Sequence, residues 1–302
     1  MSNASSQIEL YNRLSGRIEL EKVPGEALLR FCYKTSAGGW ICKWIVSRRL
    51  FSALYGRLFD QHWSRRHIDG FIADNRIDMS EVEVPEGGFA TFNDFFTRRL
   101  APGARPVDPD PAHLTAPADS RLKVFELKHQ TVLNIKGRSL TVAQLLGTDR
   151  FPSIFNGGLC LQFRLAPCDY HRFGFIESGL QGPIHSLGGR LYSVNPIALR
   201  QMPAIWGQNY RHWCFIQTPT MGTILQIEVG ATVVGSIIQH HMSGGECVRG
   251  AEKGYFRMGG STVLAILPAG CVKIDADILQ YSRQGIETLV RYGEKVGRIK
   301  TG

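Results

Sequence analysis

Several features that would place a protein in a familiar class are missing from this sequence of 302 residues. It contains no run of about 18 apolar residues, so no membrane-spanning helix is predicted. Its polar N-terminal residues lack the apolar stretch of a signal peptide, so no secretion signal is predicted. It also lacks a long block of lysine and arginine, and no nucleic-acid partner is expected.

Cysteine motifs are missing as well. The chain has seven cysteines, an odd number at scattered spacings, and none of them forms Cys-x-x-Cys. This pattern argues against a disulfide framework and against a zinc site, so no metal is expected. The lack of a disulfide framework fits a protein of the reducing cytoplasm.

Glycine and positive charge are plentiful by contrast. Many of the 33 glycines fall in turns between short apolar runs, which favours a β-rich body. The formal net charge is +9, and a basic surface attracts nucleic acid, anionic lipid or anionic small molecules, although simple solubility explains the charge equally well. The apolar share of 43% and the charged share of 20% are those of an ordinary folded protein, which argues against disorder.

The first part of the chain, to about Arg99, predicts helices. Between Trp40 and Phe59 the apolar residues recur at the spacing of one helix face, which predicts an amphipathic helix. Two tryptophans and four basic residues on this segment would suit a helix that lies in a membrane interface. The alternative is that its apolar face packs against the body of the protein.

The rest of the chain, from about residue 101, predicts strands joined by glycine and proline turns. β-Branched residues are frequent in these short runs, as they are in strands. The predicted strands include Val132–Ile135, Leu159–Leu165, Ile224–Val229, Thr232–Gln239 and Val263–Leu267, with one short helix at Thr141–Leu146.

Three segments carry side chains that could perform chemistry: Ala116–Ser120, Pro167–Arg172 and Gly259–Thr262. A serine, a histidine and an aspartate are the parts of an activated nucleophile, but spacing alone does not show that these residues meet. Ser261 does not lie in the Gly-x-Ser-x-Gly turn of hydrolases, so a serine hydrolase is a weak alternative.

The sequence Gly259-Gly260-Ser261-Thr262 has a chemical use besides that of an ordinary turn. Glycine permits the unusual backbone shape in which the Ser261 hydroxyl attacks the carbonyl of Gly260. The amide becomes an ester, loss of the serine α-proton expels the Gly260 carboxylate, and the dehydroalanine that remains hydrolyses to a pyruvoyl group with release of ammonia. These steps need a base near Ser261 and donors for the developing oxyanion.

A resemblance that covers nearly the whole chain favours this second use. The chain resembles the phosphatidylserine decarboxylases, in the bacterial branch that has Gly-Gly-Ser-Thr at the cleavage site. The matching motifs are Thr91–Arg98, Pro102–Pro106, Asp169–Phe173, Tyr192–Pro196, Glu228–Ile237 and Lys253–Thr262.

The resemblance implies roles for four residues. Ser261 becomes the pyruvoyl group, a covalent cofactor, and Gly260 becomes the end of the larger chain. Asp119 matches the aspartate that supports self-cleavage. His171 matches a histidine proposed to act in decarboxylation, as a proton donor or by positioning the substrate, and an imidazole titrates near neutral pH. The pyruvoyl ketone would form a Schiff base with the substrate amine and accept electrons as CO₂ leaves.

The resemblance also implies fold, substrate and location. We expect an α+β fold, with a helical membrane-associating region over residues 1–99 and a β-rich two-part sheet body over residues 100–302. Self-cleavage would give chains 1–260 and 261–302, the second of 302 − 260 = 42 residues. The expected reaction converts phosphatidylserine to phosphatidylethanolamine and CO₂, by a protein bound peripherally to the cytoplasmic side of the cell membrane. Relatives also suggest a homodimer.

Two positions depart from the family pattern. Gly174 stands where family members usually have a second histidine, the one paired with the aspartate to activate the serine, and Ser120 stands where they usually have glycine. His240 and His241 follow a family motif and are candidates for a substitute base; the alternative is that both face solvent at a strand end.

The departure at Gly174 leaves two other functions open. One is a pyruvoyl enzyme of the same fold that decarboxylates a free amino acid. The other is an uncleaved lipid-binding protein without enzymatic activity.

Overall fold

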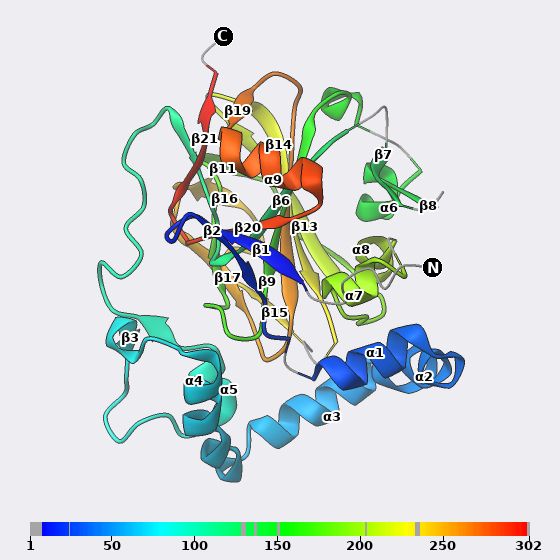
Figure 1. The fold of residues 1–302 in the computed structure, drawn as a ribbon. Coiled ribbons are helices and arrows are strands. Elements are labelled where there is room, and N and C mark those ends of the chain that lie inside the picture. The colour runs from blue at the N-terminus through cyan, green and yellow to red at the C-terminus, as the bar shows by residue number, and fades with distance from the viewer. Residues whose placement is uncertain are drawn as a thin grey trace.

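A large sheet forms the centre of the molecule (Figure 1). The computed structural model describes residues 8–23, 25–127, 131–135, 138–149, 152–202, 204–232 and 236–300. Eleven strands of these residues join in the sheet, and neighbours are antiparallel except for the parallel pair β1–β20. In spatial order they are β16 (Gly245–Cys247), β11 (Gly179–Gln181), β13 (Arg211–Thr218), β14 (Gly222–Gly230), β18 (Ser261–Leu267), β9 (Leu159–Leu165), β6 (Ser120–Glu126), β20 (Glu287–Val290), β1 (Glu9–Asn12) and β2 (Arg17–Leu20), with β12 (His185–Leu187) beside β13.

The strand β18 lies in the interior of this sheet, between β14 and β9. All seven of its residues are buried, because alternate side chains enter different cores. Val263, Ala265 and Leu267 belong to one hydrophobic cluster. Leu264 and Ile266 belong to a second one on the other face. The apolar run that predicted a buried strand is therefore a strand covered on both faces.

Smaller sheets and short helices surround the central sheet. His171 directly precedes β10, an edge strand of the three-stranded sheet β10–β17–β15. The helix α9 packs against β6 and β20 of the central sheet. The remaining elements of the body are β10 (Arg172–Gly174), β17 (Glu252–Phe256), β15 (Ile237–Gln239), β19 (Val272–Ile274), β21 (Lys295–Ile299), β5 (His113–Thr115), β7 (Thr131–Ile135), β8 (Arg138–Thr141), α6 (Val142–Leu146), η4 (Ser153–Phe155), α7 (Pro196–Leu199), α8 (Ile205–Gln208) and α9 (Ala276–Gln284).

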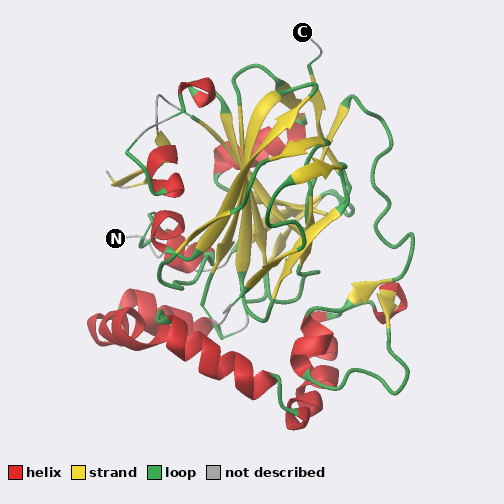
Figure 2. Cartoon of the chain, turned by 180° about the vertical axis from the view of Figure 1, so that it is seen from behind, coloured by secondary structure: helices red, strands yellow, loops and turns green. Residues whose placement is uncertain are grey.

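Helices of the first hundred residues gather at one end of the sheet body (Figures 1 and 2). Three of them, α1, α2 and α3, lie beneath the body, and α4 and α5 lie beside them. The elements are α1 (Glu26–Lys34), α2 (Ser36–Ile41), the π-helical turn η1 (Cys42–Val46), α3 (Arg49–Phe59), η2 (His62–His67), α4 (Ile68–Asn75), η3 (Met79–Glu81), the pair β3 (Val82–Glu83) and β4 (Arg99–Leu100), and α5 (Phe92–Phe96).

The prediction of one continuous helix over Trp40–Phe59 is wrong, because the helical structure is interrupted at Ser47 and Arg48. Arg48 is extended, with φ −80° and ψ 139°. The Ser47 hydroxyl donates to the Lys43 carbonyl, and the Ser47 carbonyl accepts a hydrogen bond from the backbone N–H of Leu191. Contacts with the body therefore interrupt a helix that the periodicity alone would continue.

The hairpin β1–β2 was not predicted from the sequence. It adds two strands to the edge of the central sheet, so residues 9–20 pack with the body and not with the helices. Arg13 in its turn is ion-paired with Asp275, Asp277 and Glu294. These contacts tie the N-terminal hairpin to the last part of the chain.

The α+β class expected from the sequence is confirmed, and several predicted strands match closely. Leu159–Leu165 is reproduced to the residue, and Ile224–Val229 lies within β14. Of the strand expected over Thr232–Gln239, residues 233–235 lie outside the described residues and only Ile237–Gln239 is a strand. Within the described part of the chain, no helix has the length and apolar character needed to cross a membrane.

Candidate active site

Ser261 is the first residue of β18 and is fully buried. The sheet fixes its backbone on both sides, because it pairs with Gly230 of β14 and Leu165 of β9. Two glycines precede it. Gly259 has a φ of 127°, a conformation that side-chain-bearing residues rarely adopt. The chain therefore enters the strand through a turn whose geometry requires glycine.

His171 faces Ser261. Its Nδ1 lies 3.4 Å from the Ser261 hydroxyl oxygen, and its Nε2 lies 3.0 Å from the Ala166 carbonyl oxygen. A carbonyl oxygen can only accept, so Nε2 carries the proton and Nδ1 presents a lone pair to the serine. The contact is long for a hydrogen bond, as nucleophile–base contacts often are before substrate binds. The arrangement can remove a proton from Ser261.

The surroundings of His171 keep its ring neutral. The ring is completely buried and stacks on Phe96 with 4.0 Å between ring centroids. Burial, together with the nearby Arg98 guanidinium, lowers the pKa of His171 from 6.5 to about 3. The imidazole is therefore available as an acceptor at neutral pH.

Asp119 lies apart from this pair. Its carboxylate accepts hydrogen bonds from Arg105 at 2.7–3.0 Å and from the backbone N–H of Tyr292 at 2.7 Å. Among the contacts of the described residues, none joins Asp119 to His171 or Ser261. The structure brings two of the three predicted residues together and holds the third in an ion pair nearby.

Gly174 lies in a place that has no room for a side chain. A Cβ atom there would overlap the Tyr292 hydroxyl, and it would lie 2.8 Å from Tyr292 Cζ and 2.9 Å from the Ala251 carbonyl oxygen. The backbone N–H of Gly174 donates to the Pro117 carbonyl. Tyr292 therefore fills the space of the second histidine expected from the family pattern.

The other sequence-derived candidates lie elsewhere. The Ser120 side chain is buried and donates to the Ala118 carbonyl, so it fits inside the turn. His240 is partly exposed and bonded to Glu252 at 2.7 Å. The His241 ring lies near Phe175, 6.3 Å between centroids. The structure brings His171 to Ser261, and not His240 or His241.

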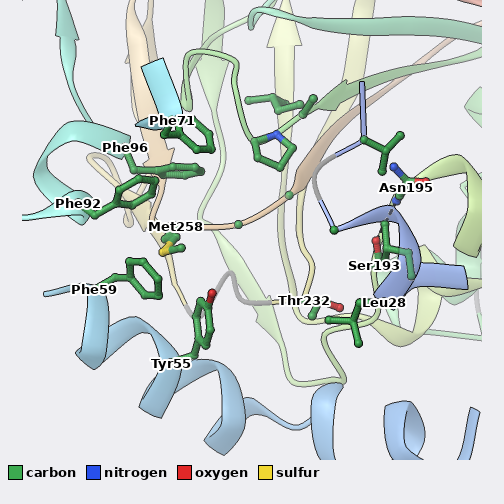
Figure 3. Close-up of a pocket in the computed structure, with 18 of the residues that line it drawn as sticks. Leu28, Tyr55, Phe59, Phe71, Phe92, Phe96, Ser193, Asn195, Thr232 and Met258 are labelled. Carbon is green, nitrogen blue, oxygen red and sulfur yellow. Dashed lines mark hydrogen bonds between the residues drawn. The ribbon is translucent and has the colours of Figure 1, made fainter. Parts of the chain in front are cut away.

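A cavity of about 610 Å³ ends at the Gly259–Gly260 turn. Figure 3 shows its two sides: aromatic side chains and Met258 on one, and Ser193, Asn195 and Thr232 on the other. Tyr55 of α3 and Leu28 of α1 line it from the helices, so the cavity lies between the helical end and the sheet body. Its lining is mainly apolar with a smaller number of polar groups, as is usual for a small-molecule site. Among the described residues, no cluster of side chains could hold a metal ion.

Comparison with known proteins decides the family. Residues 92–298 match the family model described as phosphatidylserine decarboxylase. The chain belongs to the phosphatidylserine decarboxylase family. The phosphatidylserine decarboxylase proenzyme of Clostridium botulinum (strain Alaska E43 / Type E3) is 40% identical over 96% of this chain and 98% of its own length. The proenzymes of Desulfitobacterium hafniense (strain DSM 10664 / DCB-2) and Clostridium tetani (strain Massachusetts / E88) are each 39% identical, with the same coverage.

Sequence reasoning missed several residues of this family member's site. Phe96, Arg98 and Asn195 stand in the motifs that carried the resemblance, so their positions were visible but their contacts were not. Tyr292 gave no signal at all, because nothing in its neighbourhood in the sequence points to Gly174. The assignment of this member to the Gly-Gly-Ser-Thr branch stays a prediction.

Proposed function

We propose that this chain cleaves itself between Gly260 and Ser261, and that the mature protein decarboxylates phosphatidylserine to phosphatidylethanolamine and CO₂. The observation that carries the proposal is the contact between the Ser261 hydroxyl and the unprotonated Nδ1 of His171, next to the Gly259–Gly260 turn that lines the cavity. Family membership supports the same conclusion, since the relatives carry the name proenzyme.

In self-cleavage, His171 acts as the base. Its Nδ1 accepts the proton of the Ser261 hydroxyl as the oxygen attacks the Gly260 carbonyl carbon. Phe96 and the Ala166 carbonyl hold the ring in place during this transfer. Asp119 then acts by positioning: with Arg105 it fixes the loop whose Pro117 carbonyl binds Gly174, three residues after His171.

The site suits a pyruvoyl group made from Ser261. Ser261 is fully buried and directly follows Gly260, which lines the cavity, so a ketone at this position would be shielded from bulk water and would lie next to the cavity. The group would supply an electron sink for the carbanion that remains when CO₂ leaves. After cleavage, His171 lies beside the reacting atoms and can hold or return a proton there.

The two products of cleavage would remain one protein. The 42-residue chain 261–302 contains β18, and β18 is hydrogen-bonded along its length to β14 and β9 of chain 1–260. Its later strands β20 and β21 pair with β6 and β5 of the larger chain. Separation would require breaking the central sheet, so we expect the chains to part only on denaturation.

A lipid substrate fits the surface around the cavity better than a free amino acid does. The helical end beside the cavity exposes large apolar side chains, among them Trp40 of α2, Trp44 of η1 and Leu50 of α3, with Lys43 and Arg48 beside Trp44. Such a surface binds the interface of an anionic membrane. We therefore include peripheral binding by the helical region within residues 1–99, at the cytoplasmic side, in the proposal.

Intact mass spectrometry of the purified protein tests the cleavage. The expected result is two chains that meet at Gly260 and Ser261, the smaller one carrying a pyruvoyl mass; a single uncleaved chain would favour the non-enzymatic lipid-binding protein. Release of labelled CO₂ tests the substrate. Release from dihexanoyl-phosphatidylserine is expected, whereas release from free serine alone would establish the amino acid decarboxylase.

A further inference from the structure

We propose that Asn195 binds the phosphodiester of the lipid headgroup through the N–H groups of its carboxamide. This inference rests on the function proposed above and adds the residue that distinguishes a phospholipid from a free amino acid. Only the carboxamide of Asn195 is proposed to bind the phosphodiester. The helix α7 that follows it has four residues and is too short for its N-terminus to form an anion site.

The orientation of the Asn195 side chain is fixed by the fold. Its Oδ1 accepts a hydrogen bond of 2.9 Å from the backbone N–H of Ile197, so the side chain caps the start of α7. Its backbone N–H donates to the Ser193 hydroxyl at 3.2 Å. The Nδ2 atom makes no hydrogen bond to any residue that the structure describes, which leaves two donors available at the cavity wall.

The residue before Asn195 lies close to the scissile bond. Val194, the neighbour of Asn195, has a methyl group 3.8 Å from the point where a Cβ of Gly260 would be. Figure 3 shows Asn195 and Ser193 together on the side of the cavity opposite the aromatic residues. The Ser193 backbone is held from α1, because its N–H donates to the Tyr33 hydroxyl at 2.8 Å. The headgroup must pass this wall to reach Ser261.

Several other polar groups of the cavity are already engaged or lie on another wall, and the Ser193 hydroxyl beside Asn195 accepts a hydrogen bond from the Asn195 backbone N–H. The Arg164 guanidinium is saturated by Glu21 and Glu287. The Thr232 hydroxyl donates to the Leu191 carbonyl. His67, next to Arg66 on η2, packs its ring on Phe59 among the aromatic side chains. Asn195 therefore offers two amide donors to an anionic oxygen on this wall, next to the Ser193 hydroxyl.

The chemistry of the reaction favours the phosphodiester over the carboxylate as its ligand. The carboxylate loses its charge as CO₂ leaves, so a donor that held it would stabilise the substrate more than the transition state and would slow the reaction. The phosphodiester keeps its charge from substrate to product. Hydrogen bonds to it position the headgroup without opposing the chemical step.

Two substitutions remove the amide N–H donors and keep an oxygen for the cap. Asn195→Ser retains an oxygen that can accept from the Ile197 N–H but has no amide N–H. Asn195→Asp also retains the cap, is nearly the same shape, and replaces the donors with a negative charge. Matching thermal unfolding curves for both variants and the parent would show that each still folds.

Binding is measured by calorimetry on the full-length Ser261→Ala precursor, so that neither cleavage nor turnover is needed. The ligand is dihexanoyl-phosphatidylethanolamine, which has the phosphodiester and no carboxylate. We expect Asn195→Ser to weaken its binding about tenfold, since a hydrogen bond to a charged group is lost, and Asn195→Asp to weaken it more. Unchanged affinity in both variants, or no binding to the parent precursor, would overturn the proposal.

Dihexanoyl-phosphatidylserine in the same assay separates the two anionic groups. If Asn195 contacts the phosphodiester, both lipids lose affinity by the same factor. A loss confined to phosphatidylserine would assign the contact to the carboxylate and overturn the proposal. Failure of the proposed function would show separately, as a parent protein with its native serine that stays uncleaved. The binding assay does not depend on that result, because it uses the Ser261→Ala precursor.

Discussion

The hydroxyl of Tyr292 lies in the space that any side chain at Gly174 would need. The two residues come from β10 and from the turn after β20, and Tyr292 also binds Asp119 through its backbone N–H. The glycine at position 174 and the position of the tyrosine ring therefore depend on each other. His171, three residues before Gly174, faces Ser261.

This relationship predicts that Gly174→Ala destabilises the protein. The added methyl overlaps the tyrosine and approaches the Ala251 carbonyl, so we expect the free energy of unfolding to fall by about 1–3 kcal/mol in a urea titration of the Ser261→Ala precursor. Tyr292→Leu removes part of the obstruction, and the double variant should lose less than the sum of the single ones. Strict additivity would show that the ring does not fill this space.

His171 and the two alternative candidates, His240 and His241, can be compared by the rate of self-cleavage. We expect His171→Gln to slow the appearance of the 42-residue chain on a gel by about 10²–10⁴-fold, the usual loss when a general base is removed. His240→Gln and His241→Gln serve as matched controls and should mature at the parent rate. Normal maturation of the His171 variant would exclude it as the base.

How far the sequence predicts this site depends on the range of the contacts involved. The buried strand after Gly260 follows from a local apolar run, and the strand is found where the run predicts it. The break at Ser47 does not follow from local sequence, because it depends on a hydrogen bond from Leu191. The family motifs indicated that Ser261 and His171 share one site. Proximity to such a motif in the sequence did not predict the position of His240, which is exposed and hydrogen-bonded to Glu252.

The low pKa of His171 predicts a specific pH dependence of stability. Burial lowers this pKa from 6.5 to about 3, so between these values the unfolded chain binds a proton that the folded chain does not. The contribution of His171 to the free energy of unfolding is therefore complete above pH 6.5. As the pH falls below 6.5, this contribution is lost at about 1.4 kcal/mol for each pH unit. Urea unfolding of the Ser261→Ala precursor from pH 7 to pH 5 measures it.

The same titration on a precursor that also carries His171→Gln gives the comparison. Other carboxylates titrate in both proteins, so the difference between the two slopes isolates position 171. Equal slopes would mean that the imidazole is protonated as readily in the folded chain as in the unfolded one.

Asp119 and Arg105 are expected to act as a unit. Both side chains are largely buried in their ion pair. Removing Arg105 takes away the cation that the Asp119 carboxylate contacts, and removing Asp119 leaves Arg105 with Glu81, its other carboxylate partner at 2.9 Å. We expect Asp119→Asn and Arg105→Gln each to slow maturation and to lower the free energy of unfolding. Because the residues share one contact, the double variant should show a coupling energy of about 1–3 kcal/mol. A defect in Asp119→Asn alone would instead support a direct part in the cleavage chemistry.

Exposed apolar residues on the helices and on the sheet body provide a matched test of the membrane surface. Leu50 on α3 is 72% exposed and Leu180 on β11 is 52% exposed, so a glutamate at either position should be tolerated by the fold. If the helical end lies in the interface, Leu50→Glu loses apolar burial and meets the negative surface of an anionic bilayer. We expect it to reduce co-sedimentation with phosphatidylserine vesicles at least tenfold, while Leu180→Glu, with the same change of charge, binds like the parent. If both variants lost co-sedimentation equally, the effect would be explained by the change in net charge. If neither lost it, the membrane contact would lie elsewhere on the molecule.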